Sequence, residues 1–204
     1  MKLCVYGASS NAIDPKYLEA GRELGKILAQ RLHRLIYGGG NTGMMGAVAD
    51  GAAEFGGDII GVAPTFFESW GVLRTEGVRM VFTETMRERK AYMEDHADAF
   101  IVTPGGIGTF EEFFETLTLK QLGRLFKPII ILNTDGYYDS LLDLLENTVK
   151  NGFLEAAALG GILVARTPEE AVDLAEREAR RHLCPVCGEF AFSRRGSYEI
   201  CPVC

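Results

Sequence analysis

The chain has 204 residues, of which 47% are hydrophobic and 24% charged, and its formal net charge is −7. A chain of this length and composition can bury one substantial core, so we expect one main domain with at most a small appendage. No apolar run approaches the ~18 residues of a membrane span, and the acidic balance argues against general binding to the backbone of nucleic acids.

The first predicted unit is a buried strand at residues 1–6 followed by a helix that starts at Asp14-Pro15, an N-cap residue with proline at the first helical position. The opening apolar run is too short for the core of a signal peptide, so we expect a cytoplasmic protein. Between strand and helix, residues 7–11 form a small-residue loop that contains Ser9. Open α/β sheets bind ligands at this end of a strand, although a plain connection explains the loop equally well.

A second glycine loop, residues 38–43, follows the next predicted strand. It matches the dinucleotide fingerprint G-x-G-x-x-G, but the strand after it ends in Ala63-Pro64, without the acidic residue that would hold the ribose of NAD. We therefore favour a mononucleotide site, in which a sugar or base approaches the backbone closely at Gly39 and Gly40.

Two less regular segments come next. Residues 65–77 show no clean periodicity and contain the single tryptophan, so they form either a lid or rim over a site or a packed loop. Thr83 is predicted to cap the following helix, with Met86 at the position where a capping box would have Glu or Gln. On this helix Met86 and Lys90 share one side with Arg89 beside them. From the residues alone, the charges at 87–90 would be a solvated run.

The most informative stretch is residues 103–112, T-P-G-G-I-G-T-F-E-E, between an apolar strand and a helix. Gly105, Gly106 and Gly108 let backbone N–H groups converge, and the helix that begins near Thr109 adds its positive N-terminal end. This combination predicts an anion seat, most naturally for a phosphate. Glu112, in the first turn of the helix, could then act on atoms attached to that phosphate. The alternative is a tight turn with an ordinary capping glutamate.

Strands and helices go on alternating after this loop. An apolar strand is predicted at residues 128–132, a helix at 138–150 and a last strand at 161–165. A capping box at residues 167–170 starts the helix that runs to about residue 182. About seven strands alternating with as many helices predict a doubly wound, Rossmann-like parallel sheet over residues 1–182.

The chain changes character in residues 183–204, which hold two C-x-x-C pairs separated by thirteen residues. This spacing suits tetrahedral coordination of one metal ion by four thiolates. We expect a small zinc ribbon, with iron or disulfides as alternatives that fit a cytoplasmic chain less well. Four protein ligands would leave no position for a substrate, so the zinc would be structural. Its ligands would be Cys184, Cys187, Cys201 and Cys204.

The motif P-G-G-x-G-T-x-x-E at residues 104–112, preceded by Met86, Arg89 and Lys90, resembles the LOG family of cytokinin-activating phosphoribohydrolases. Many members of that family carry an old lysine-decarboxylase label. The resemblance runs from about residue 3 to about residue 175 and includes the D-G-Y-Y motif at residues 135–138.

The resemblance implies hydrolysis of the N-glycosidic bond of a nucleoside 5′-monophosphate, either an N6-substituted AMP or AMP itself, without a catalytic cofactor. It implies a homodimer or larger homo-oligomer and a catalytic pair, Arg89 and Glu112. In the family a glutamate in the region of residues 65–77 touches the substrate; the local sequence here departs from the usual pattern, which leaves Glu68 as the candidate. The full set of candidate substrate contacts is Lys90, Met86, Gly105, Gly106, Gly108, Thr109, Glu111, Gly39, Gly40, Ser9 and Glu68.

The expected chemistry assigns different roles to the two catalytic residues. Departure of the base builds positive charge at the anomeric carbon, which the carboxylate of Glu112 can stabilise while it orients or deprotonates water. An arginine keeps its proton near neutral pH, so Arg89 would offer hydrogen bonds and positive charge to the base or orient Glu112. Two other readings stay open: a nucleotide-binding protein without turnover, and a decarboxylase that would need pyridoxal phosphate on a lysine.

Overall fold

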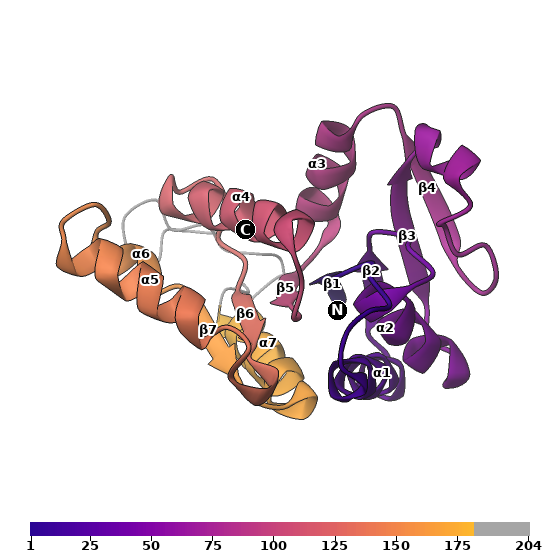
Figure 1. The fold of residues 1–204 in the computed structure, drawn as a ribbon, viewed down its shortest axis with the longest axis horizontal. Coiled ribbons are helices and arrows are strands. Elements are labelled where there is room, and N and C mark those ends of the chain that lie inside the picture. The colour runs from indigo at the N-terminus through magenta and orange to yellow at the C-terminus, as the bar shows by residue number, and fades with distance from the viewer. Residues whose placement is uncertain (182–204) are drawn as a thin grey trace, which may run out of the picture.

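The computed structural model describes residues 1–181, which form a parallel sheet covered by helices on both faces (Figure 1). The sheet has seven strands in the order β4-β3-β2-β1-β5-β6-β7, and every neighbouring pair is parallel. The prediction of a doubly wound parallel sheet is confirmed. The strands are β1 (Lys2–Tyr6), β2 (Arg34–Tyr37), β3 (Ile59–Pro64), β4 (Arg79–Thr83), β5 (Ala99–Val102), β6 (Ile129–Leu132) and β7 (Ile162–Ala165).

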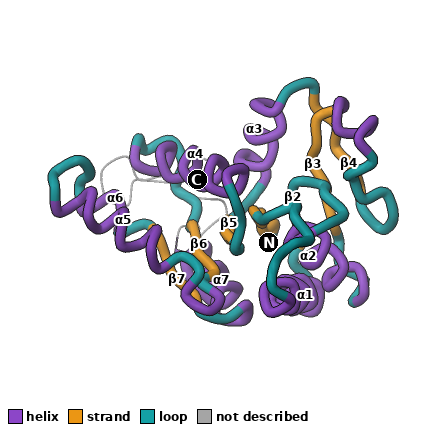
Figure 2. Tube along the Cα trace, viewed as in Figure 1, coloured by secondary structure: helices purple, strands orange, loops and turns teal. Residues whose placement is uncertain are grey.

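Seven α-helices and two short 3-10 helices connect these strands within the described residues. Figure 2 shows α1, α2 and α7 on one side of the strands and α3 and α4 on the other. The helices are α1 (Pro15–Gln30), α2 (Gly43–Glu54), α3 (Met86–His96), α4 (Ile107–Gln121), α5 (Asp139–Lys150), α6 (Ala156–Leu159) and α7 (Pro168–Arg181). The 3-10 helices are η1 (Thr65–Trp70) and η2 (Thr134–Gly136).

Two hydrophobic cores lie on the two faces of the sheet, as the alternation of side chains along a strand requires. Along β1, Leu3 and Val5 belong to the core under α1, α2 and α7, whereas Cys4 and Tyr6 belong to the core under α3 and α4. The strand β5, next to the central strand β1, is buried along its whole length. This burial holds the carboxyl ends of β1 and β5 rigidly side by side.

Three helix starts can be compared with the sequence predictions. Asp14 caps α1, its carboxylate accepting from the backbone N–H of Lys16 at 3.0 Å, and Thr167 caps α7 as predicted. The prediction of Thr83 as the cap of α3 was wrong. Thr83 is the last residue of β4, and the true cap is Thr85. The Thr85 hydroxyl accepts from the N–H of Glu88 at 3.1 Å, and the Glu88 carboxylate accepts from the N–H of Thr85, which completes a capping box.

The topology fixes where a ligand can bind. The chain runs from β1 to β2 on one side, while β5 pairs with β1 on the other, so the loops after β1 and β5 leave the sheet at its switch point. Within residues 1–181, no helix combines the length and apolar character needed to cross a membrane. The predicted zinc ribbon, with its four cysteines, lies outside the described residues.

Candidate active site

A cavity of about 520 Å³ opens at the carboxyl ends of the central strands. Its walls come from the loops after β1, β2 and β5, from the first turns of α3 and α4, and from η1. A second cavity of similar size lies at the opposite edge of the sheet, around Met1, His33 and Asp98. We take the first cavity as the site because doubly wound sheets bind their ligands at the carboxyl edge.

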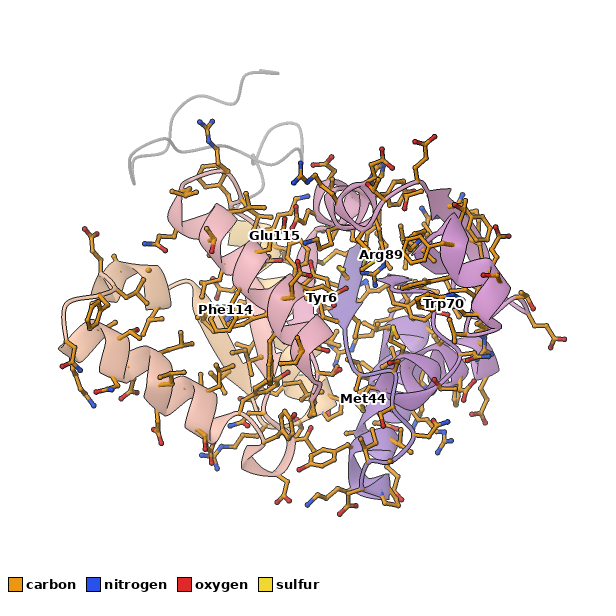
Figure 3. All side chains as sticks on the ribbon, turned by 45° about the horizontal axis from the view of Figure 1, so that its top comes forward. Tyr6, Met44, Trp70, Arg89, Phe114 and Glu115 are labelled. Carbon is orange, nitrogen blue, oxygen red and sulfur yellow. The ribbon has the colours of Figure 1, made fainter. Side chains whose placement is uncertain are left out.

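Arg89 and Glu112 form a buried ion pair in the wall of this cavity. Nη1 of Arg89 donates to Oε1 of Glu112 at 2.8 Å, and Nε of Arg89 donates to the carbonyl oxygen of Val62 at 3.0 Å. Only 6% of Arg89 and 8% of Glu112 are exposed. The two residues come from different helices, α3 and α4, so the pair exists only in the folded protein. Arg89 is labelled in Figure 3.

The ion pair depends on a glycine in the loop after β2. A Cβ atom on Gly38 would lie 2.3 Å from Nη2 of Arg89, so a larger residue there would displace the guanidinium. The G-G-G sequence predicted to bring a ligand close to the backbone therefore also makes room for Arg89. Gly39 has φ of +76°, which glycine adopts without strain, and it packs beside Met80.

The electrostatic environment opposes the charge on Glu112. Burial raises the pKa of the Glu112 carboxyl above its ordinary value, and the charge and hydrogen bond of Arg89 oppose part of that rise. A carboxylate held in this way has lost most of its contact with water and interacts strongly with a positive charge placed nearby. This is the environment expected of a group that stabilises a developing cation.

The N-terminus of α4 is open toward the cavity. Its N-cap is Gly106, which has no side chain to accept from the first N–H groups, and Gly106, Gly108 and Thr109 line the cavity. By contrast, α3 is closed by the capping box of Thr85 and Glu88. The helix begins at Ile107, two residues earlier than predicted. An anion placed here would meet unpaired N–H groups and the positive end of the helix.

Apolar side chains also line the cavity. Phe67 and Trp70 come from η1, and Met45, Leu73 and Met86 come from neighbouring segments. The ring centroids of Phe67 and Trp70 lie 5.0 Å apart, and Trp70, labelled in Figure 3, is 63% exposed. The segment with no clean periodicity thus forms a rim of the cavity, so the rim reading of residues 65–77 is the one that the fold supports.

The structure brings most of the candidate contacts together. The cavity is lined by Ser9, Gly40, Met86, Arg89, Gly106, Gly108, Thr109, Glu111 and Glu112. Four other candidates lie outside its lining: Gly39, Glu68, Lys90 and Gly105. Gly105 packs against Thr109 beneath the loop, and Glu68 is exposed on η1.

Lys90 faces α4. Its ammonium pairs with the carboxylates of Glu111 and Glu115, one turn apart on that helix. Glu94, which also lies on α3, is affected by this group of charges. Its burial, together with the nearby charge of Glu115, raises its pKa to about 7. The ion pairs of Lys90 therefore link α3 to α4.

The lining also contains residues that were not singled out from the sequence as contacts, among them Ile107, Phe67 and Trp70. Ile107 lies inside the glycine motif and could have been found from it. For Phe67 and Trp70, the only sign in the sequence that they would line the cavity was their position directly after the strand β3. Within residues 1–181, no group of three or more His, Cys, Asp or Glu side chains could hold a metal ion.

The fold and the site define a doubly wound α/β protein with a helix start that lacks a capping side chain and a buried carboxylate–guanidinium pair at its switch point. A family model described as "Possible lysine decarboxylase" matches residues 45–175. Two proteins of Arabidopsis thaliana named cytokinin riboside 5′-monophosphate phosphoribohydrolase, LOG3 and LOG2, are also similar. LOG3 is 40% identical over 183 residues, covering 89% of this chain and 84% of its own. LOG2 is 35% identical over 181 residues, covering 89% and 85%. The chain belongs to the LOG family.

Among solved structures, the molybdenum cofactor carrier protein of Chlamydomonas reinhardtii is similar, with a TM-score of 0.66 and 22% sequence identity. The match covers 87% of this chain and 96% of that chain. At this level of identity the likeness shows the fold alone.

Proposed function

We propose that the protein hydrolyses the N-glycosidic bond of a nucleoside 5′-monophosphate, giving a free base and ribose 5-phosphate. The observation that carries this proposal is the buried pair of Arg89 and Glu112, which lies in the wall of a cavity that also contains the open N-terminus of α4. The relatives named as phosphoribohydrolases, 35% and 40% identical to this chain, support the same reaction.

The cavity suggests how such a substrate would lie. The phosphate would bind the N–H groups from Gly106 to Thr109, where the helix dipole favours an anion. The ribose would then lie beside Glu112, and the base would reach the apolar rim formed by Trp70 and Met86. An aromatic and methionine-lined rim accepts the face of a purine and an apolar substituent on it, so we propose AMP or N6-substituted AMP as the substrate class.

The reaction follows from this placement. The bond between the anomeric carbon and the base nitrogen breaks, and the bonding electrons leave with the base. The positive charge that develops on the ribose is stabilised by the Glu112 carboxylate. A water molecule oriented by Glu112 supplies the new oxygen at the anomeric carbon. Of its two hydrogens, one stays on the ribose hydroxyl and the other passes through Glu112 and ends on the base.

Arg89 acts mainly by holding Glu112. Because it donates to both the Val62 carbonyl and Glu112, its guanidinium is fixed between β3 and α4. Its charge favours the ionised form of Glu112 against the effect of burial. An arginine does not readily release a proton near neutral pH, so Arg89 is not the acid of this reaction.

We further propose that residues 183–204 bind one structural zinc ion through Cys184, Cys187, Cys201 and Cys204. The support is the spacing of the two C-x-x-C pairs in the sequence. A segment of this size cannot bury enough apolar surface to fold alone, so its folding would depend on the metal.

The test of the activity is a panel of nucleoside 5′-monophosphates incubated with the full-length protein, with products separated by chromatography. We expect free base and ribose 5-phosphate in equal amounts from at least one adenosine monophosphate. Glu112→Gln serves as the matched inactive control. Tight binding of a monophosphate by calorimetry, without any release of base, would overturn the proposal in favour of a nucleotide-binding protein without turnover.

A further inference from the structure

The D-G-Y-Y motif at residues 135–138 has no part in the chemistry described above, yet it contacts the anion loop directly. The hydroxyl of Tyr137 donates to the carbonyl oxygen of Gly105 at 2.7 Å. The hydroxyl of Tyr138 donates to the carbonyl oxygen of Thr103, also at 2.7 Å. Both tyrosines come from the segment between β6 and α5, behind the loop, and neither lines the cavity among the described residues.

The peptide between Gly105 and Gly106 joins two residues that have no Cβ atom, so its orientation is not restricted by side chains of its own. In a planar trans peptide the carbonyl of one residue and the N–H of the next point in opposite directions. With the Gly105 carbonyl turned back toward Tyr137, the N–H of Gly106 must point away from Tyr137. Gly106 itself lines the cavity, and we include this N–H in the proposed anion seat.

Rotation of this peptide would reverse the polarity of the seat. It would change φ of Gly106 from −98° to roughly +80°, a region that glycine enters without strain. The rotated peptide would present the Gly105 carbonyl oxygen to the anion in place of the Gly106 N–H, and that oxygen would repel a phosphate.

We propose that Tyr137 is a positioning residue that holds the Gly105–Gly106 peptide in its phosphate-binding orientation. The ring of Tyr137 is itself held between Tyr17 of α1, at 5.6 Å between centroids, and Tyr138, at 4.9 Å. The hydroxyl is therefore presented to the loop from a fixed direction. The inference rests on the proposed function only in taking the anion to be the 5′-phosphate of the substrate.

The test compares Tyr137→Phe with Tyr17→Phe, using ribose 5-phosphate as the probe. Tyr137→Phe removes the hydroxyl and keeps the ring contacts. Tyr17→Phe is the matched control, because the Tyr17 ring packs on Tyr137 while its hydroxyl makes no hydrogen bond to the loop within the described residues. Affinity is measured by calorimetry, and melting temperatures are recorded for all three proteins.

We expect Tyr137→Phe to weaken ribose 5-phosphate binding about tenfold, the scale of one hydrogen bond, and Tyr17→Phe to change it less than twofold. With AMP as substrate, Tyr137→Phe should raise KM about tenfold and leave kcat within twofold, since the phosphate contact is made equally in the ground and transition states.

Three results would overturn the proposal: parent-like binding by Tyr137→Phe, an equal loss in Tyr17→Phe, or no binding of ribose 5-phosphate by the parent. A protein that binds ribose 5-phosphate as expected but releases no base from any monophosphate would contradict the proposed function and leave this inference standing.

Discussion

Glu112 combines two properties that usually exclude each other, a negative charge and almost complete burial. The Glu112→Gln substitution keeps the size of the side chain and its ability to accept from Arg89, while it removes the charge. We expect turnover to fall about 100-fold or more, the scale seen when one preorganised electrostatic group is lost. Binding of the monophosphate should hold or rise slightly, because the anion seat consists of backbone N–H groups. Base release and calorimetry on one preparation measure both effects.

Glu115 provides the control for this substitution. It lies on the same helix as Glu112, pairs with Lys90 and does not line the cavity among the described residues. Glu115→Gln should leave turnover within about twofold of the parent. If Glu112→Gln still releases base at a rate near that of the parent, Glu112 is a helix residue without catalytic duty and the mechanism is wrong.

The pH dependence of the reaction should report the burial of Glu112. The reaction needs the carboxylate, and burial raises its pKa above the ordinary 4.5, so activity should be lost as the pH falls through that raised value. Arg89→Gln removes the charge that opposes the rise in the Glu112 pKa. We therefore expect the acid limb of its activity profile to move to higher pH, and we expect its maximal rate to fall. Profiles of kcat/KM against pH for the two proteins check this. Superimposable acid limbs would contradict it.

At the scale of the elements, the start of α3 matters because this helix carries Arg89. Thr85→Ala removes the N-cap side chain and should lower the free energy of unfolding by about 1 kcal/mol. Thr83→Ala, at the residue that the sequence suggested as the cap, should cost less than half as much, since Thr83 donates only to the Thr85 carbonyl. Urea denaturation of the two variants measures the difference. Equal losses would mean that the capping box adds little.

Most elements could be predicted because their signals are local. The apolar runs gave the strands, and Asp14-Pro15 gave the start of α1. The cap of α3 was missed because Thr83, Glu84 and Thr85 all precede the helix within three residues, and the length of β4 decides which of them is free to cap. That length depends on pairing with β3, which the local sequence does not contain.

The proposed catalytic pair could be named from the motif that resembles the LOG family, but the geometry of the pair could not be predicted. Arg89 and Glu112 are 23 residues apart, and the 2.8 Å contact follows from the packing of α3 beside α4. The contacts of Lys90 with Glu111 and Glu115 depend on the same packing. The sequence shows that residues 87–90 are charged, but it does not show where each side chain points. In the fold, Arg89 points inward to Glu112, whereas Lys90 points toward α4.

At the scale of the whole molecule, α4 exposes apolar side chains that a monomer would leave in water. Ile107 is 83% exposed and Phe114, labelled in Figure 3, is 39% exposed. We expect at least a dimer, measured by light scattering at micromolar concentration. Phe114→Glu should shift the mass toward that of a monomer. A monomeric parent would contradict the prediction.

The C-terminal residues should be separable from the catalytic body. Metal analysis of freshly prepared reduced protein should find about one zinc ion per chain, and truncation after Leu183 should remove it. Because every proposed catalytic residue lies before residue 182, the truncated protein should keep most of its activity. Absence of zinc from the full-length protein would contradict the metal site, and loss of activity on truncation would show that the tail supports catalysis.

The helix α4 carries both the proposed anion seat and the proposed catalytic carboxylate, so the helical rise sets the distance between them. Glu112 follows Ile107 by five positions, a rise of about 7.5 Å along the axis. In the proposed placement, this rise along α4 corresponds to the distance in the ligand from the phosphate to the N-glycosidic bond that breaks. A chain of two or three phosphates seated by its terminal phosphate would carry the anomeric carbon beyond the carboxylate. With the phosphate seated as proposed, we expect this length, without any added side chain, to favour a single phosphate.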